Sequence, residues 1–128
     1  MGVRYLSDEW AQAVQDALNA NESFRSAIAT QSARVQQVVT TSDGEARYWF
    51  KLEGGQVHLG TGDLAEAVDA TITQDYDTAV AISRNELSPT AAYMSGKMRV
   101  SGDLMKLMQL QGSMGQMPAA LKDLEVDY

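Results

Sequence analysis

Residues 88–103 read SPTAAYMSGKMRVSGD, a stretch in which we expect a helix, a strand and the start of a second helix. Ser88 is a favourable N-cap, and Pro89 suits the first helical position because an N–H there would have no helical partner. Gly96 is expected to end that helix, since glycine readily adopts the left-handed conformation of a C-terminal cap. Residues 97–101 alternate basic and apolar side chains, which indicates a strand. After the turn at Gly102-Asp103, residues 104–111 or slightly more have the pattern of an amphipathic helix.

Upstream of this stretch, the pattern predicts a long helix and then a three-stranded meander. The helix begins after the N-cap Ser7, and its apolar face is formed by Leu6, Trp10, Ala13, Val14, Ala17 and Leu18. Residues 33–40 are β-prone, although their alternation is imperfect. Asp43-Gly44 and Gly54-Gly55 are tight-turn signals that separate residues 33–40, 45–53 and 56–60 into three strands. On the second strand, Tyr48 and Phe50 share one face, with Arg47 and Lys51 on the other.

The segment between the meander and the opening stretch predicts a fourth strand over residues 69–73 and a helix over residues 75–84. With residues 97–101 this makes five strands, and the hairpins are separate from the helices. Such an order is typical of the α+β class, with helices covering one face of a mostly antiparallel sheet. We expect a single domain over residues 1–128, and the pattern leaves open whether the fifth strand pairs in parallel with an earlier one.

Composition and charge exclude several classes of function. The chain has 128 residues, is 45% apolar and carries a net charge of −7. Its ten basic residues are scattered singly, so we expect no nucleic-acid binding and no electrostatic docking to an anionic membrane. The absence of cysteine excludes disulfides, thiol catalysis and thiolate metal sites. We see no signal peptide, no stretch long enough for stable membrane insertion and no peroxisomal address, and therefore expect a cytoplasmic protein.

The chain is poor in residues that carry catalysis. Its one histidine, His58, is expected to lie on the strand face opposite Val57 and Leu59, where a solvated side chain is a better interpretation than a catalytic one. The carboxylates of Asp75 and Asp77 are better explained as charges at a helix N-terminus than as a catalytic pair. No acidic cluster has the spacing of a calcium loop. We expect no catalytic residue, no metal and no cofactor.

The unusual feature of the composition is methionine, because six of the seven methionines fall between residues 94 and 117. Methionine is flexible and polarizable, so it packs well against ligands of variable shape. In the last long helix, Leu104, Leu107, Met108 and Gln111 fall on one stripe. These methionines could line a pocket, fill an irregular core or form a partner-binding surface, and composition alone favours the core.

Residues 69–111 resemble the sterol carrier protein 2 family. The resemblance lies in DATIT at residues 69–73, AYMSGKMRVSGD at residues 92–103 and MQLQ at residues 108–111, with Tyr48 where the family often has an aromatic residue. It implies a five-stranded sheet covered by helices, with an apolar cavity between them. It further implies binding of a fatty acid, an acyl-CoA or a sterol-like lipid without chemistry.

The expected ligand-binding residues come from two sources. The resemblance implies that Tyr48, Met108 and Gln111 face the cavity. Strand alternation and the helical stripe add Phe50, Met98, Val100 and Leu104. The segment after Gln111 contains glycines and a proline and departs from the family, so the closure of the cavity is left open.

We consider three functions on this basis. The first is a non-catalytic carrier that binds an apolar lipid in an internal cavity. The second is a small cavity enzyme, for instance an isomerase, in which Asp103 and Tyr93 would be the candidate residues. The third is a module that presents a lipid to a separate enzyme, which an exposed methionine patch would favour.

Overall fold

The computed structural model describes residues 2–114, 117–121 and 123–128, without the side chains of residues 111, 112, 114 and 118. Its elements, in chain order, are β1 (Val3–Arg4), α1 (Asp8–Ala20), α2 (Glu22–Ala27), β2 (Ala33–Thr41), β3 (Gly44–Glu53), β4 (Gln56–Thr61), β5 (Ala70–Asp75), α3 (Tyr76–Ser83), α4 (Pro89–Met94), β6 (Met98–Gly102), α5 (Leu104–Met114), α6 (Met117–Ala120) and β7 (Val126–Asp127).

Polar side chains begin the helices at the positions that the sequence predicts. Ser7 Oγ accepts a hydrogen bond from the Trp10 N–H at 3.1 Å, and Ser88 Oγ accepts one from the Ala91 N–H at 3.1 Å. Asp75 Oδ1 does the same for the Thr78 N–H at 2.8 Å. These bonds satisfy N–H groups that the first turn of a helix leaves without a partner, so they set where each helix begins.

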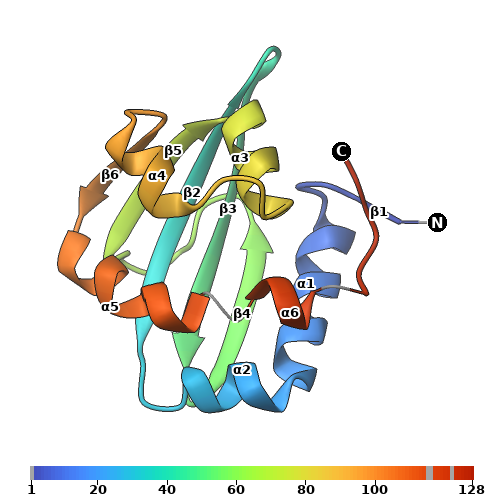
Figure 1. The fold of residues 1–128 in the computed structure, drawn as a ribbon, viewed down its shortest axis with the longest axis vertical. Coiled ribbons are helices and arrows are strands. Elements are labelled where there is room, and N and C mark those ends of the chain that lie inside the picture. Colours follow the sequence, from blue (N-terminus) through green and yellow to red (C-terminus); the bar gives the residue numbers. More distant parts are fainter. Residues whose placement is uncertain (1, 115–116, 122) are drawn as a thin grey trace.

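The main sheet has five strands in the order β4-β3-β2-β5-β6 (Figure 1). The predicted meander β2-β3-β4 is antiparallel, and β6 is antiparallel to β5. The parallel pair is β2 with β5, so the sheet is mixed but mostly antiparallel. The chain passes from β4 to β5 through residues 62–69, which cross over β3 and β2 before β5 joins the sheet.

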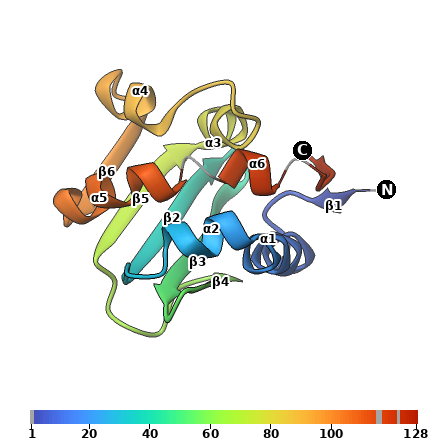
Figure 2. The ribbon, with the colours of Figure 1, turned by 60° about the horizontal axis from the view of Figure 1, so that its bottom comes forward.

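The helices lie on one side of this sheet (Figure 2). α1 packs along the edge strand β4, while α3 contacts β2 and β5, and α4 contacts β6. The connection of residues 62–69 lies against the opposite face, where Gln36 Oε1 accepts from the Leu64 N–H at 2.9 Å and Glu66 pairs with Arg34 at 2.9 Å. One face of the sheet is therefore covered by helices and the other by a loop and charged side chains.

A second, two-stranded sheet joins the two ends of the chain, which the sequence pattern did not predict. β1 and β7 run parallel, with Val3 opposite Val126. The bonds from the Val3 N–H to the Glu125 carbonyl and from the Tyr5 N–H to the Asp127 carbonyl are both 2.9 Å long. Tyr5, next to this sheet, is buried against the rings of Trp10, Tyr76 and Tyr128.

Candidate functional site

Strand alternation places a continuous apolar surface on the side of the sheet that the helices cover, which we call the covered face. It carries Ala33, Val35, Gln37 and Val39 of β2; Ala46, Tyr48, Phe50 and Leu52 of β3; Val57 and Leu59 of β4; Ala70, Ile72 and Gln74 of β5; and Met98 and Val100 of β6. The register sets Phe50, Val35 and Ala70 side by side, and likewise Gln37, Ile72 and Val100. Four of the seven predicted ligand-binding residues, Tyr48, Phe50, Met98 and Val100, thus lie on this face.

The two predicted aromatic residues occupy the middle of the covered face. Phe50 packs against both hydrophobic clusters of the core, the larger one containing residues of α1, α2 and α3 and the smaller one containing Ala92 of α4. The ring of Tyr48 meets that of Trp10 edge to face, with 5.0 Å between the ring centroids. Burial raises the pKa of Tyr48 above its ordinary value. Both residues are nevertheless only partly buried.

The two predicted residues of β6 extend the same surface toward α4. Met98 is buried with Val35, Ile72 and Ala92, and Val100 packs at the margin of this cluster. Leu107 of α5 contacts this cluster as well as the larger one, as Phe50 does. β6 therefore joins the covered face to the helices above it.

The predicted apolar stripe of α5 faces the core only in part. Leu104 and Met108 are exposed, at 37% and 59% of their surface, whereas Leu107 and Leu110 face the core. Ser113 faces inward with them, donating from Oγ to the carbonyl oxygen of Ala27 at 3.0 Å. The side chain of Gln111 lies outside the described part. Contact of Leu104, Met108 and Gln111 with a ligand stays a prediction.

Sequence reasoning missed two polar side chains within this apolar surface, Gln37 and Gln74. Both are buried, and the Nε2 group of Gln74 donates to Oε1 of Gln37 at 3.2 Å. Gln74 Oε1 is buried without a hydrogen-bond partner among the described residues. The available signal was a glutamine at an inward position of an alternating strand. In β2, however, Gln36 and Gln37 are adjacent, so the sequence does not show which of them points inward.

Charge is segregated between the two faces of the sheet. The positions on the covered face carry no charged side chain. On the opposite face, Lys51 pairs with Glu66 at 3.0 Å, and Arg47 pairs with Asp63 at 3.1 Å. The bond to Lys51 holds the pKa of Glu66 below its ordinary value. A ligand held against the covered face would meet apolar side chains and neutral amides.

Two surface recesses are lined by described residues, and neither includes a predicted site residue. The first, of about 310 Å³, lies where α5 meets the segment after α2 and includes Gln31 and Lys106. The second, of about 220 Å³, lies beside α3 and includes Asp77 and Leu87. They are separate from the surface formed by Tyr48 and Phe50.

Both candidate catalytic residues are exposed. Asp103 is exposed and caps α5, its Oδ1 accepting from the Lys106 N–H at 3.0 Å, and Tyr93 is exposed at the end of α4. His58 lies beside Lys51 on the face away from the helices. Across the described ranges, no three His, Asp or Glu side chains gather as metal ligands would.

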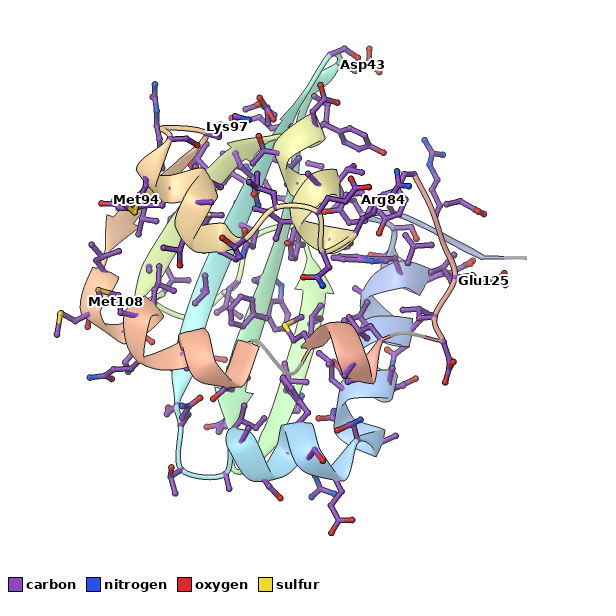
Figure 3. All side chains as sticks on the ribbon, viewed as in Figure 1. Asp43, Arg84, Met94, Lys97, Met108 and Glu125 are labelled. Atoms are coloured by element: carbon purple, nitrogen blue, oxygen red, sulfur yellow. The ribbon has the colours of Figure 1, made fainter. Side chains whose placement is uncertain are left out.

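Several large apolar side chains are exposed around the end of α4 and the beginning of α5. We call this surface the methionine patch; it consists of Tyr93, Met94, Leu104, Met105 and Met108. Met94 and Met108 lie along the same side of the molecule (Figure 3). Three of the clustered methionines therefore face solvent rather than the core. Of the helices in the described ranges, none is both long enough and apolar enough to cross a bilayer.

The fold is that of a small α+β domain in which helices cover one face of a five-stranded mixed sheet. The sequence pattern of the SCP-2 sterol transfer family matches residues 9–115, so the chain belongs to this family. A crystal structure of sterol carrier protein 2 superposes with a TM-score of 0.81 at 19% identity, covering 95% of this chain and 100% of that one. The solution structure of palmitated SCP2L2 from Aedes aegypti gives 0.61 at 21% identity, covering 79% and 90%. These two likenesses show the fold, and they confirm the predicted fold class.

A curated relative is longer than this chain. Hydroxysteroid dehydrogenase-like protein 2 of Xenopus tropicalis is 26% identical over 109 residues, which are 84% of this chain and 26% of that protein. The chain thus spans about a quarter of that relative's length. In the relative, the matching domain is one part of a larger protein.

Proposed function

We propose that this protein binds an apolar lipid between the covered face and the helices above it, and carries that lipid without chemical change. The observation that supports this most directly is the covered face itself, which is uncharged and apolar and on which Tyr48 and Phe50 are only partly buried. Removing an acyl chain from water yields roughly 0.8 kcal/mol per CH₂ group. Such a ligand needs few polar contacts for affinity, so specificity for the chain would be loose.

Family membership supports the same proposal, and so does the palmitated state of SCP2L2 from Aedes aegypti, a structural neighbour. Palmitate, an acyl-CoA and a sterol are therefore the probes to compare. Native mass spectrometry and thermal shift would report whether each forms a saturable complex with the protein. Failure of all three to bind at saturating concentration would refute the proposal.

A pair of substitutions on one strand would localise the site. Val100→Trp adds bulk on the covered face, whereas Ser101→Trp adds the same side chain on the opposite face, where residue 101 is exposed. We expect Val100→Trp to weaken lipid binding about tenfold or more, a change of about 1.4 kcal/mol, and Ser101→Trp to leave binding unchanged. Circular dichroism would confirm that both variants fold. Equal affinities in two folded variants would place the ligand elsewhere.

The methionine patch supports a second candidate, in which the protein delivers its lipid to an enzyme. Exposed apolar surface of this kind is typical of an interaction site. The Xenopus tropicalis relative suggests a dehydrogenase-type domain as the partner, since the matching domain accounts for only 26% of that protein. Titration of this protein with the remaining portion of the relative would test the idea. Binding that is lost in the triple variant Met94→Ser, Met105→Ser, Met108→Ser would support it, and absence of binding would refute this partner.

A further inference from the structure

The amide pair Gln37–Gln74 is a polar site inside the apolar surface of the sheet. Gln37 is 8% exposed and Gln74 is 6% exposed, and Gln74 Nε2 donates to Gln37 Oε1 at 3.2 Å. Gln74 Oε1 is buried and has no hydrogen-bond partner among the described residues. A buried acceptor without a donor is costly, and buried polar groups in proteins nearly always have a partner. The pair is therefore incomplete without a further group.

The neighbouring Gln36 shows how this chain completes a purely structural glutamine. Its Nε2 donates to the carbonyl oxygens of Tyr48 at 3.0 Å and Gly62 at 2.9 Å, and its Oε1 accepts from the Leu64 N–H at 2.9 Å. The Gln36 amide thus holds residues 62–69 against the sheet, and both its nitrogen and its oxygen have partners. Gln74, in contrast, lies on the covered face, which faces the proposed ligand, and its Oε1 has no partner among the described residues.

The surroundings of the pair determine what could complete it. The register sets Gln37 beside Tyr48 and Ile72, and Gln74 beside Val39 and Met98. No position of the covered face carries a charge, so the sheet itself offers a carboxylate no counter-ion. A carboxylate also lacks the hydrogen that Gln74 Oε1 requires. Burying an ion without a partner is unfavourable, and an apolar molecule with a neutral hydroxyl avoids that cost.

We propose that Gln74, oriented by Gln37, hydrogen-bonds the hydroxyl of a neutral, hydroxylated apolar ligand and so selects an alcohol over the carboxylate of equal chain length. This inference rests on the proposed lipid-binding function and specifies its ligand class. A hydroxyl both donates and accepts. In the present arrangement a ligand hydroxyl can donate to Gln74 Oε1. If both amide groups are flipped, so that O and N exchange places, the hydroxyl can accept from Gln74 Nε2.

The test compares three ligands with the same sixteen-carbon chain length: 1-hexadecanol, palmitate and hexadecane. Partition of each radiolabelled ligand from phosphatidylcholine vesicles into the protein is measured for the natural chain and for Gln74→Met, which keeps the length of the side chain. We expect Gln74→Met to lower hexadecanol partition about tenfold and to leave hexadecane partition unchanged. Gln56→Leu, at an exposed position of β4, is the control that should change neither.

The outcomes separate this inference from the function on which it rests. If hexadecane and palmitate bind but Gln74→Met leaves hexadecanol partition unchanged, a buried water completes the amide pair. In that case this inference fails while the proposed lipid-binding function stands. If palmitate binds better than hexadecanol, the inference also fails. If none of the three ligands enters the natural chain, and an acyl-CoA and a sterol also fail to bind, the proposed carrier function itself is refuted. The melting temperature of Gln74→Met checks its fold. The variant removes the unpartnered Gln74 Oε1 but also takes the donor away from Gln37 Oε1, so we expect little net change in stability.

Discussion

Asn19 of α1 hydrogen-bonds both backbone groups of Val57 in the edge strand β4. Its Nδ2 donates to the Val57 carbonyl oxygen and its Oδ1 accepts from the Val57 N–H, each at 2.9 Å. One turn earlier, Gln15 Oε1 accepts from the Leu59 N–H at 2.9 Å. The free edge of a sheet invites pairing with another chain, and here the side chains of a helix occupy it.

Replacement of Asn19 by alanine is expected to lower the free energy of unfolding by about 2 kcal/mol, because two partly buried backbone groups lose their partners. The freed edge should also increase self-association. Urea denaturation and size-exclusion chromatography measure the two effects. The control is Gln12→Ala on the same helix, since Gln12 is exposed and its side chain bonds to the exposed Asp16. Equal urea midpoints for the two variants would contradict the expectation.

The Asp75 cap makes stability depend on pH. The hydrogen bonds from the Thr78 side chain and backbone hold the pKa of Asp75 below its ordinary value of 3.8. A lowered folded-state pKa means that the ionised cap stabilises the protein above about pH 4 and that this contribution is lost as the pH falls through the folded-state pKa. We expect Asp75→Ala to cost about 1 kcal/mol at neutral pH and much less in strong acid.

Thermal denaturation over a series of pH values would measure this difference. Asp77→Asn, which removes a charge from the same helical turn without removing the cap, controls for net charge. A cost of Asp75→Ala that stays constant down to the lowest pH would contradict the linkage between this carboxylate and folding.

Much of the fold could be predicted because its signals are local. The caps at Ser7 and Ser88, the turn at Asp43-Gly44 and the alternation along residues 45–53 each depend on neighbouring residues, and the structure bears each out. The pairing of β1 with β7 joins residues at opposite ends of the chain. Two-residue strands carry too few side chains to show a period, so no local pattern could reveal them.

The predicted stripe of α5 was only partly right, because leucine or methionine occupies residues 104, 105, 107, 108 and 110. Stripes through Leu104 and Met108 or through Leu107 and Leu110 are then almost equally apolar. Only the tertiary contacts of the helix with the sheet decide between them. The Gln37–Gln74 pair was missed for a related reason, since the adjacent glutamines 36 and 37 leave the inward face of β2 undetermined until its register is known.

Gly102 is expected to tolerate no side chain. Its φ is +102°, and a Cβ there would lie 2.5 Å from the Asp69 carbonyl oxygen, which also accepts the N–H of Asp103. Gly96 has a φ of +80° but open space around it, so Gly96→Ala measures the backbone strain alone. We expect about 1 kcal/mol of destabilisation for Gly96→Ala and at least about 2 kcal/mol more for Gly102→Ala. If chemical denaturation gave equal losses of unfolding free energy for the two variants, the turn between β6 and α5 would be able to shift and accommodate the added Cβ.

Leu107 and Met108 are adjacent in α5 and differ in what they contact. Leu107 touches both hydrophobic clusters, whereas Met108 is 59% exposed. Truncation of Leu107 to alanine removes contacts between the helix and the sheet and should cost about 2 kcal/mol. Met108→Ala should change stability by less than about 0.5 kcal/mol, because an exposed side chain loses little on truncation. Urea denaturation of both variants decides the orientation of the helix: a larger loss for Met108→Ala would mean that α5 presents its methionines to the sheet, and the methionine patch would then be part of the core.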